Sequence, residues 1–218
     1  MRGGVVAALL LLSACAAPPP PFAGEPYAPS RPDPSPTGER PAQAWERLIK
    51  PADRQRILGA DEAWASALAS ARRAGHADRL QALGPLAVER AAQLATPPEG
   101  DFRCRTIKLG AAGPGLLDYV AYDWFRCRIV RESDGYALTK LTGSQRQVGR
   151  LYPDPTRGWV FVGVLAIAGD PVPAYGQDPE QDAVGLFQKI GDQHWRLVLP
   201  WSRRESQLDL IEFRPETR

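Results

Sequence analysis

The amino-acid sequence predicts an α+β protein: an N-terminal helical segment followed by an antiparallel β-meander, a small barrel of about eight strands, closed or half-open. Three observations carry this prediction. Apolar residues recur at helical spacing before residue 98, and β-branched and aromatic runs separated by turn residues follow from residue 99. No connection between these runs is long enough for a helical crossover, so neighbouring strands are expected to be antiparallel.

The predicted helical segment, 42–98, is rich in Ala, Leu and Arg. Pro51, with Asp53 as a possible cap, and Gly75 frame one helix of about twenty residues. A further helical piece covers 78–94. The Trp and Leu side chains of these helices form an apolar stripe, which we expect to pack against the outside of the barrel or across one of its ends.

The predicted β domain, 99–216, contains runs with strand character. They cover 102–109, 117–131, 136–142, 146–152, 159–168, 183–190, 194–199 and 207–213. Gly, Asp, Ser and Pro separate several of these runs in connections of hairpin type. Closure into a barrel would remove the exposed edges of such a sheet, and a strongly curved open sheet is the alternative.

Residues 1–14 have the pattern of a lipoprotein signal peptide. Arg2 supplies a basic start, and the apolar run 5–12 is too short to span a bilayer as a permanent helix. The sequence Leu-Ser-Ala then stands directly before Cys15, which resembles the lipobox of bacterial lipoproteins. Cys15 is therefore the predicted lipidation site, and an ordinary signal peptide cut near Ala14 or Ala17 is the alternative.

Residues 15–41 are predicted to form the lipid anchor and a tether. Of the 22 prolines, 10 lie between Pro18 and Pro41. Prolines at this density hold a chain extended at about 3.1 Å per residue. Ala16 rather than Asp follows Cys15, which by resemblance to Gram-negative sorting rules favours the periplasmic face of the outer membrane over the inner membrane.

The sequence contains 3 cysteines. With Cys15 lipidated, Cys104 and Cys127 remain as a pair in an oxidising compartment, so a disulfide between them is predicted. Each lies in a Phe-Arg-Cys-Arg tetrapeptide. Neither belongs to a Cys-x-x-Cys unit, so a redox-active or metal-binding pair lacks support.

The same repeat suggests a candidate anion-binding surface. Side chains alternate along a strand, so Arg103, Arg105, Arg126 and Arg128 would share the face opposite the cysteines. Arg forks suit carboxylates and phosphates. The four arginines either pair with Asp and Glu on a solvated surface, or bind a phospholipid headgroup, a lipopolysaccharide phosphate or an acidic peptide.

Four segments carry a resemblance to a known family. They are FRCRTIKLG (102–110), YDWFRC (122–127), KLTGSQR (140–146) and WRLVLP (195–200). They resemble an uncharacterised proteobacterial lipoprotein family, domain of unknown function 4893, over about 45–214. The resemblance implies no activity, because no established catalytic or binding residues come with it.

No catalytic residue, metal site or cofactor is predicted. His76 and His194 are expected in surface turns, and no serine lies in a Gly-x-Ser-x-Gly motif. Asp178, Glu180 and Asp182 lack the glycine and the terminal glutamate of a calcium loop, so a solvated acidic loop is expected. The net charge of +2, from 27 basic and 25 acidic residues, gives no reason to expect a nucleic-acid partner.

Three functional classes follow. The favoured one is a noncatalytic, membrane-anchored periplasmic lipoprotein whose barrel recognises a small anionic ligand, a lipid or an envelope protein. The second is a protein inhibitor or chaperone-like partner of an exported protein, with the proline-rich loop 171–179 as a binding segment. The third, a hydrolase, has the least support, because acid, base and nucleophile candidates do not cluster in the sequence.

Overall fold

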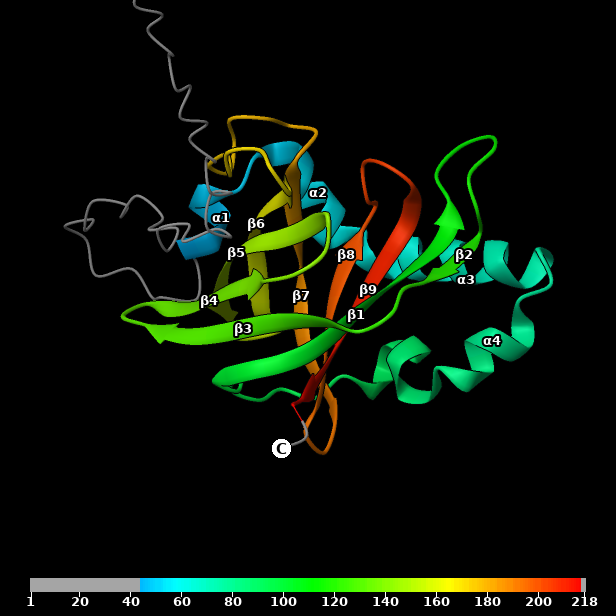
Figure 1. The fold of residues 1–218 in the computed structure, drawn as a ribbon, viewed down its shortest axis with the longest axis horizontal. Helices are drawn as coiled ribbons and strands as arrows, with labels where there is room; N and C mark the ends of the chain where they lie inside the picture. Colours follow the sequence, from blue (N-terminus) through cyan, green and yellow to red (C-terminus); the bar gives the residue numbers. More distant parts are fainter. Residues whose placement is uncertain (1–43, 217–218) are drawn as a thin grey trace, which may run out of the picture.

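The computed structural model describes residues 44–216, so the predicted signal peptide 1–14, the tether 15–41 and Cys15 lie outside the described residues. The predicted fold class is confirmed. A short helical part precedes antiparallel strands that form a closed barrel of 8 strands plus one extra strand. The barrel is closed because its first strand, β1 (Gly100–Ala111), pairs with its last, β9 (Ser206–Pro215) (Figure 1).

Between β1 and β9, six strands follow one another around the barrel in chain order. They are β3 (Phe125–Glu132), β4 (Gly135–Lys140), β5 (Gln145–Asp154), β6 (Gly158–Ile167), β7 (Asp182–Gly191) and β8 (His194–Pro200). The extra strand, β2 (Tyr119–Ala121), pairs with β1. The helices are α1 (Ala44–Leu48), α2 (Pro51–Leu58), α3 (Ala60–Arg73) and α4 (Ala77–Ala82), followed by the 3₁₀ turns η2 (Gly84–Ala87) and η3 (Glu89–Ala91).

The helices pack against the outside of the barrel, along β1, β7, β8 and β9 (Figure 1). Trp45, Trp64 and Leu86 from the helical part are buried in one cluster with Leu109 and Val198 from the strands. Where the helices cover them, these strands therefore bury apolar side chains on their outer face as well. Of the two placements predicted for the helices, packing on the outside is the one observed.

The barrel interior is filled by its own side chains over much of its length. Phe161, Phe187 and Phe213 are buried there with Leu138 and Leu151. The Phe187 and Phe213 rings meet edge to face with their centroids 5.4 Å apart. An eight-stranded barrel is just wide enough for side chains to fill it, so no large cavity is expected in this part.

Two facing glycines make room for one of these rings. Gly149 of β5 and Gly163 of β6 are register partners. A Cβ on either would lie 2.6 Å from the Cα of the other and 2.8 Å from the Phe161 ring. Glycine at both positions lets β5 and β6 approach each other and leaves room for the Phe161 ring against the two glycines in the barrel interior.

The long helix predicted between Pro51 and Gly75 is in fact two helices, because α2 ends at Gly59. The Trp201 indole donates a hydrogen bond to the Gly59 carbonyl at 3.2 Å, and a Cβ at Gly59 would lie 3.3 Å from the indole nitrogen. The barrel side chain therefore occupies the break between the helices. Asp53 is not the cap of α2: Lys50 holds that position, and Asp53 is fully buried in the first turn.

The strand predicted over 117–131 is interrupted by a β-bulge. Cys104 of β1 pairs with Phe125, and Ile107 pairs with Ala121, so two residues of β1 face three residues of the partner, 122–124. The extra residue separates β2 from β3 and turns β2 away from the barrel wall. β4 pairs with β3 but not with β2, so the wall ends beside the bulge.

The predicted disulfide between Cys104 and Cys127 is present, with a Cα–Cα distance of 5.9 Å. The two tetrapeptide repeats pair with each other, because Phe102 faces Cys127 and Cys104 faces Phe125 across β1 and β3. Both cysteines are fully buried inside the barrel. The disulfide therefore joins the two strands just before the bulge.

A single buried arginine attaches the end of the helical part to the barrel. The Arg196 guanidinium donates hydrogen bonds to the carbonyls of Leu86 (3.1 Å), Val88 (2.7 Å) and Glu89 (2.7 Å) and lies 4.5 Å from the Trp64 ring centroid. Burial lowers the pKa of Arg196 to about 10, so it remains charged at neutral pH. The Val88 and Glu89 carbonyls also accept hydrogen bonds from the backbone of Ala91 and Ala92, and Arg196 adds a second donor to each of them at the end of the helical part.

Reduction of the Cys104–Cys127 disulfide is expected to lower the free energy of unfolding by about 3 kcal/mol, because the bridge constrains the unfolded chain. Urea denaturation of oxidised and reduced protein measures this difference. The double variant Cys104→Ala/Cys127→Ala should match the reduced protein and no longer respond to reductant. Two free thiols in the oxidised, denatured chain would contradict the prediction.

Candidate functional site

The inward side chains change from apolar to polar at the end of the barrel where β2 turns away. Cys104 is followed on the same face of β1 by Thr106 and Lys108, and Leu138 is followed on β4 by Lys140. These side chains line a cavity of about 90 Å³, which we call the polar mouth. Its lining residues are Thr106, Lys108, Tyr122, Phe125, Lys140, Ser144, Gln145 and Gln147.

Two lysines converge on the polar mouth, and each is only 4% exposed. The Lys108 ammonium donates to Glu205 at 2.7 Å and to the Gln145 side-chain oxygen at 3.2 Å. The Lys140 ammonium donates to the Gln145 backbone carbonyl at 2.9 Å and lies 3.9 Å from the Phe125 ring centroid. Lys108 thus has a carboxylate partner, whereas Lys140 has none among residues 44–216.

The charges around the polar mouth are unequally compensated. Burial, together with the neighbouring cations Lys108 and Arg146, lowers the pKa of Lys140 to about 8. Burial also raises the pKa of Asp209, which faces inward from β9, and so weakens that group as a counter-ion. The hydrogen bond from Lys108 lowers the pKa of Glu205. Lys108 and Glu205 therefore form a neutral pair, and the charge of Lys140 is left largely uncompensated.

Two polar atoms of the polar mouth have no hydrogen-bond partner in the described part of the chain. They are the Thr106 hydroxyl oxygen and the Gln147 side-chain oxygen, both buried. Buried polar groups in folded proteins are almost always hydrogen-bonded, to water or a ligand where protein groups do not reach. The cavity therefore has the capacity to hold a small polar molecule.

The turn after β4 positions the outer wall of the polar mouth. Gly143 adopts φ 92°, a left-handed conformation that side chains other than glycine rarely take, and a Cβ there would lie 2.9 Å from the Phe125 ring. The Arg146 guanidinium donates to the Gly143 carbonyl at 2.8 Å. This turn keeps Phe125 against Lys140 and returns the chain as β5, which begins with Gln145.

The four predicted anion-binding arginines share the outer surface of β1 and β3, as expected from alternation, and we call this surface the arginine face. Arg103 and Arg126 are register partners across the two strands. The Arg103 and Arg105 guanidiniums lie 4.5 Å and 4.8 Å from the centroid of the Trp124 ring, which the bulge places on this surface. The arginine face is therefore a contiguous surface, separate from the polar mouth.

Carboxylates neutralise much of the arginine face. Arg105 pairs with Glu212 at 2.6 Å, Arg128 with Asp101 at 2.6 Å, and Arg126 with Glu216 at 3.3 Å. This is the solvated, paired arrangement that the sequence left open beside anion binding. Anion binding by Arg103, Arg105, Arg126 and Arg128 stays a prediction.

His194 is not in an exposed turn, contrary to the expectation from sequence. It begins β8, is 3% exposed, and its Nε2 lies 2.8 Å from the Glu212 carboxylate. Burial would raise the pKa of Glu212, but hydrogen bonds from His194 and Arg105 outweigh it and lower the pKa to about 2. Among residues 44–216, no serine or cysteine side chain is hydrogen-bonded to His194, and the histidine does not line the polar mouth.

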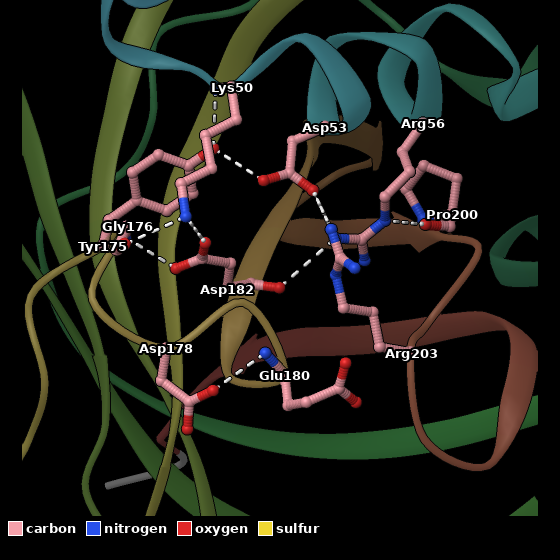
Figure 2. Close-up of polar contacts among 10 residues, drawn as sticks. All are labelled: Lys50, Asp53, Arg56, Tyr175, Gly176, Asp178, Glu180, Asp182, Pro200 and Arg203. Carbon is pink, nitrogen blue, oxygen red and sulfur yellow. Dashed lines mark hydrogen bonds and ion pairs between the residues drawn. The ribbon is translucent and has the colours of Figure 1, made fainter.

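A second polar cluster attaches α2 to two loops of the barrel (Figure 2). The Asp53 carboxylate accepts hydrogen bonds from Arg56 (3.0 Å), Tyr175 (2.7 Å) and Arg203 (2.9 Å). Tyr175 lies between β6 and β7, and Arg203 lies between β8 and β9. We call these four residues the Asp53 clamp.

The Asp53 clamp has the character of a structural joint. Burial would raise the pKa of Asp53, but the hydrogen bonds from Tyr175, Arg203 and Arg56 outweigh it and hold the pKa below its usual value. A cavity of about 20 Å³ adjoins the clamp, is lined by Arg56 and Arg203, and shares Gln147 with the polar mouth. The clamp therefore closes the far side of the site.

The acidic loop before β7 does not gather its carboxylates. Asp178 accepts from the Glu180 backbone at 3.0 Å, whereas the buried Asp182 side chain pairs with Lys50 at 3.1 Å (Figure 2). Tyr175 anchors the same loop to α2. Across residues 44–216, no group of three His, Cys, Asp or Glu side chains is arranged to hold a metal ion.

Sequence reasoning missed the polar mouth. Lys108 and Lys140 lie inside predicted strands, at positions where alternation from Cys104 and Leu138 points them into the barrel. The usable signal was an apolar inward face that becomes polar partway along two strands. It was not decisive, because a lysine at the end of a strand is usually solvated.

The fold and the site define a disulfide-linked, closed antiparallel barrel with an outer helical layer and a small cationic cavity. A family model described as Domain of unknown function (DUF4893) matches residues 45–213, and the chain belongs to this family. No curated protein and no solved structure matches the chain. Within the described residues, no helix is both long and apolar enough to cross a membrane.

Replacement of the clamp carboxylate, Asp53→Asn, is expected to lower the free energy of unfolding by about 3 kcal/mol at neutral pH, because two arginines lose their buried partner. The depressed pKa of Asp53 stabilises the fold above the unfolded pKa, and this contribution disappears as pH falls through the folded pKa. The difference between wild type and variant should therefore shrink below about pH 4.

Urea denaturation across this pH range measures the effect of Asp53→Asn. The matched control is Asp178→Asn, an exposed carboxylate that bonds only within its own loop, and it should leave the stability essentially unchanged. Equal stability of Asp53→Asn and Asp178→Asn would show that the clamp is not a structural joint.

Proposed function

We propose that the protein is a noncatalytic binding module that holds a small anion in the polar mouth, on a chain anchored by a lipid at Cys15 to the periplasmic face of the outer membrane. One observation carries the binding proposal. Two buried lysine ammoniums face one cavity, and among the described residues only one of them has a carboxylate partner. A buried charge without a partner is unfavourable, and an anionic ligand would compensate it.

The polar mouth offers complementary groups for such a ligand. The Lys140 ammonium supplies charge, and the Thr106 hydroxyl can donate a hydrogen bond to an anionic oxygen. The Gln147 side-chain oxygen can accept one from an O–H of the ligand or from a water. A hydrogen phosphate or a short acid presents both kinds of group, which supports this ligand class.

The cavity volume restricts the size of the ligand. A volume of about 90 Å³ corresponds to about three water molecules, well below the 300–1,000 Å³ of sites for drug-sized ligands. A lipid tail or a folded peptide does not fit such a cavity. The volume therefore favours a free small anion over a lipid or a protein as the occupant of the polar mouth.

The lining residues do not support hydrolysis. Ser144 lines the polar mouth, but neither a histidine nor a carboxylate lines it with the serine. The Lys140 amine is hydrogen-bonded to the Gln145 carbonyl rather than to Ser144, so no base is positioned to activate the serine. The loop 171–179, considered for binding another protein, is attached to α2 through Tyr175. These contacts favour a binding module over the other two functional classes.

Titration with sulfate tests the binding proposal, because sulfate keeps a constant charge between about pH 6 and pH 10. Calorimetry should detect one site, and amide shifts should locate it around Lys108, Lys140 and Gln147. Affinity should fall by about tenfold per pH unit above the pKa of Lys140, about 8, because the ammonium loses its proton there.

Lys140→Met should weaken sulfate binding by at least about tenfold, since it removes the uncompensated charge and keeps the chain length. The control is Arg103→Gln/Arg126→Gln/Arg128→Gln on the arginine face, which should bind sulfate as wild type does. Loss of binding in the control alone would assign anion binding to the arginine face. Amide shifts that do not respond to sulfate would show that the polar mouth holds water only.

The anchoring proposal rests on the signal-peptide pattern and on Cys15. Cys15→Ala is expected to move the protein from the membrane fraction to the soluble fraction and to abolish incorporation of a radioactive fatty acid. Cys104→Ala/Cys127→Ala is the control and should remain lipidated. Equal fatty-acid labelling of wild type and Cys15→Ala would overturn the lipidation site.

A further inference from the structure

We propose that Lys140 is a nucleophilic amine that condenses with the carbonyl group of a small 2-oxo acid held in the polar mouth and forms an imine. The inference rests on the proposed function, because the acid group of this ligand is the anion that the site would bind. It adds a covalent step and a ligand class, an acid with an adjacent aldehyde or ketone.

The surroundings of Lys140 distinguish it from other lysines of the chain. Lys50 pairs with Asp182 at 3.1 Å, and Lys108 pairs with Glu205 at 2.7 Å. Lys140 lines the cavity without a carboxylate partner in the described residues and is 4% exposed. An amine that is shielded from bulk water and not engaged by a carboxylate is available to react.

Two contacts fix the position of the amine. The Gln145 backbone carbonyl accepts a hydrogen bond from Lys140 Nζ at 2.9 Å, and the Phe125 ring centroid lies 3.9 Å from the same atom. Gln145 also accepts, through its side chain, from Lys108 at 3.2 Å. One residue thus holds both amines at the same cavity, which is the positioning that a bound carbonyl compound needs.

The electrostatic surroundings enlarge the fraction of Lys140 that is neutral, and so reactive, near physiological pH. The charged or titratable groups that act on Lys140 are Lys108 on β1, Arg146 on β5 and Asp209 on β9. Burial and the two cations lower the pKa of Lys140 to about 8, while Asp209 opposes them. Burial and adjacent cations are the means by which lysines become nucleophiles in imine-forming proteins.

The condensation balances without an oxidant or a reductant. The lone pair of Lys140 Nζ attacks the carbonyl carbon and forms the C–N bond, and the carbonyl oxygen takes a proton from the Lys108 ammonium. The nitrogen then returns a proton to Lys108, so the product of this step is a neutral carbinolamine. The Lys108 ammonium gives a proton to its hydroxyl, the C–O bond breaks, water leaves, and the nitrogen lone pair forms the C=N bond. The protonated imine then returns its proton to Lys108. The sum is amine plus carbonyl giving imine plus water.

Cationic and polar groups favour an acid over a neutral carbonyl compound. The carboxylate of a 2-oxo acid would compensate the Lys140 ammonium on binding and the protonated imine after condensation, and the Gln147 oxygen could accept a hydrogen bond from the carbinolamine hydroxyl. The volume of about 90 Å³ limits the ligand to very short acids. Glyoxylate, the smallest 2-oxo acid, is therefore the probe.

Reductive trapping tests the proposal. The full chain is incubated with glyoxylate and sodium cyanoborohydride, which adds hydride to an imine and leaves a stable secondary amine, and peptide mapping locates it. Lys140 should be modified at least about tenfold faster than Lys189, a half-buried lysine of β7 that does not line the polar mouth. The preference should disappear in urea, where all lysines are equally accessible.

Lys140→Arg should lose the adduct, and Lys189→Arg should retain it at Lys140. If Lys140→Arg unfolds, the rates of modification in native and denatured wild type still test whether the folded structure makes Lys140 more reactive than Lys189. Modification of Lys140 no faster than of Lys189 in the native protein overturns the proposal.

Sulfate separates this inference from the proposed function. Selective trapping at Lys140 that sulfate suppresses supports both. Selective trapping without any binding of sulfate supports the imine and contradicts the anion module. Binding of sulfate without selective trapping leaves the anion module in place and overturns the imine.

Discussion

The structure depends on how β1 pairs, because the two halves of this strand have different neighbours on one side. β1 pairs with β9 along almost its whole length, which closes the barrel, but it pairs with β3 only as far as Cys104. Beyond the bulge its partner is β2, which has no further neighbour in the sheet. Closure satisfies the backbone hydrogen bonds of both terminal strands, and the bulge opens the wall on one side. The barrel therefore has a filled part, joined by the disulfide, and a polar mouth beside the bulge.

Burial separates two groups of cations that look similar in the sequence. The arginines on the outer face of β1 and β3 meet carboxylates and solvent, where an ion pair contributes little and exchanges readily. Lys108 and Lys140 point the other way, into the polar mouth, where each side chain is 4% exposed. There each charge loses its hydration, so a missing counter-ion changes the pKa of an amine and creates a demand for an anion. Whether a cation lies inside or outside the barrel wall therefore decides whether its pKa is shifted and whether it lacks a counter-ion.

Local sequence patterns were sufficient to predict those parts of the structure that neighbouring residues determine. Alternation and turn residues predicted the antiparallel barrel, and the cysteine count in an exported protein predicted the Cys104–Cys127 bridge. Predictions were wrong where a distant residue intervenes. Trp201 divides the long helix at Gly59, Glu212 pairs with His194 where the histidine is buried on the outer face of the barrel wall, and pairing with β1 breaks the strand at the bulge. No pattern confined to one segment contains these partners.

The amino-acid sequence was enough to specify helices first and antiparallel strands second, the disulfide and the two faces of each strand, because these follow from periodicity and from the chemistry of neighbouring residues. It left open whether the sheet closes, which the pairing of β1 with β9 decides. Only the tertiary structure decided that β2 leaves the wall beside Lys108 and Lys140, and that Asp53 and Arg196 bind the helices to the barrel. These are contacts between segments far apart in the chain, and burial, which sets the charge and reactivity of each group, exists only once those segments have met.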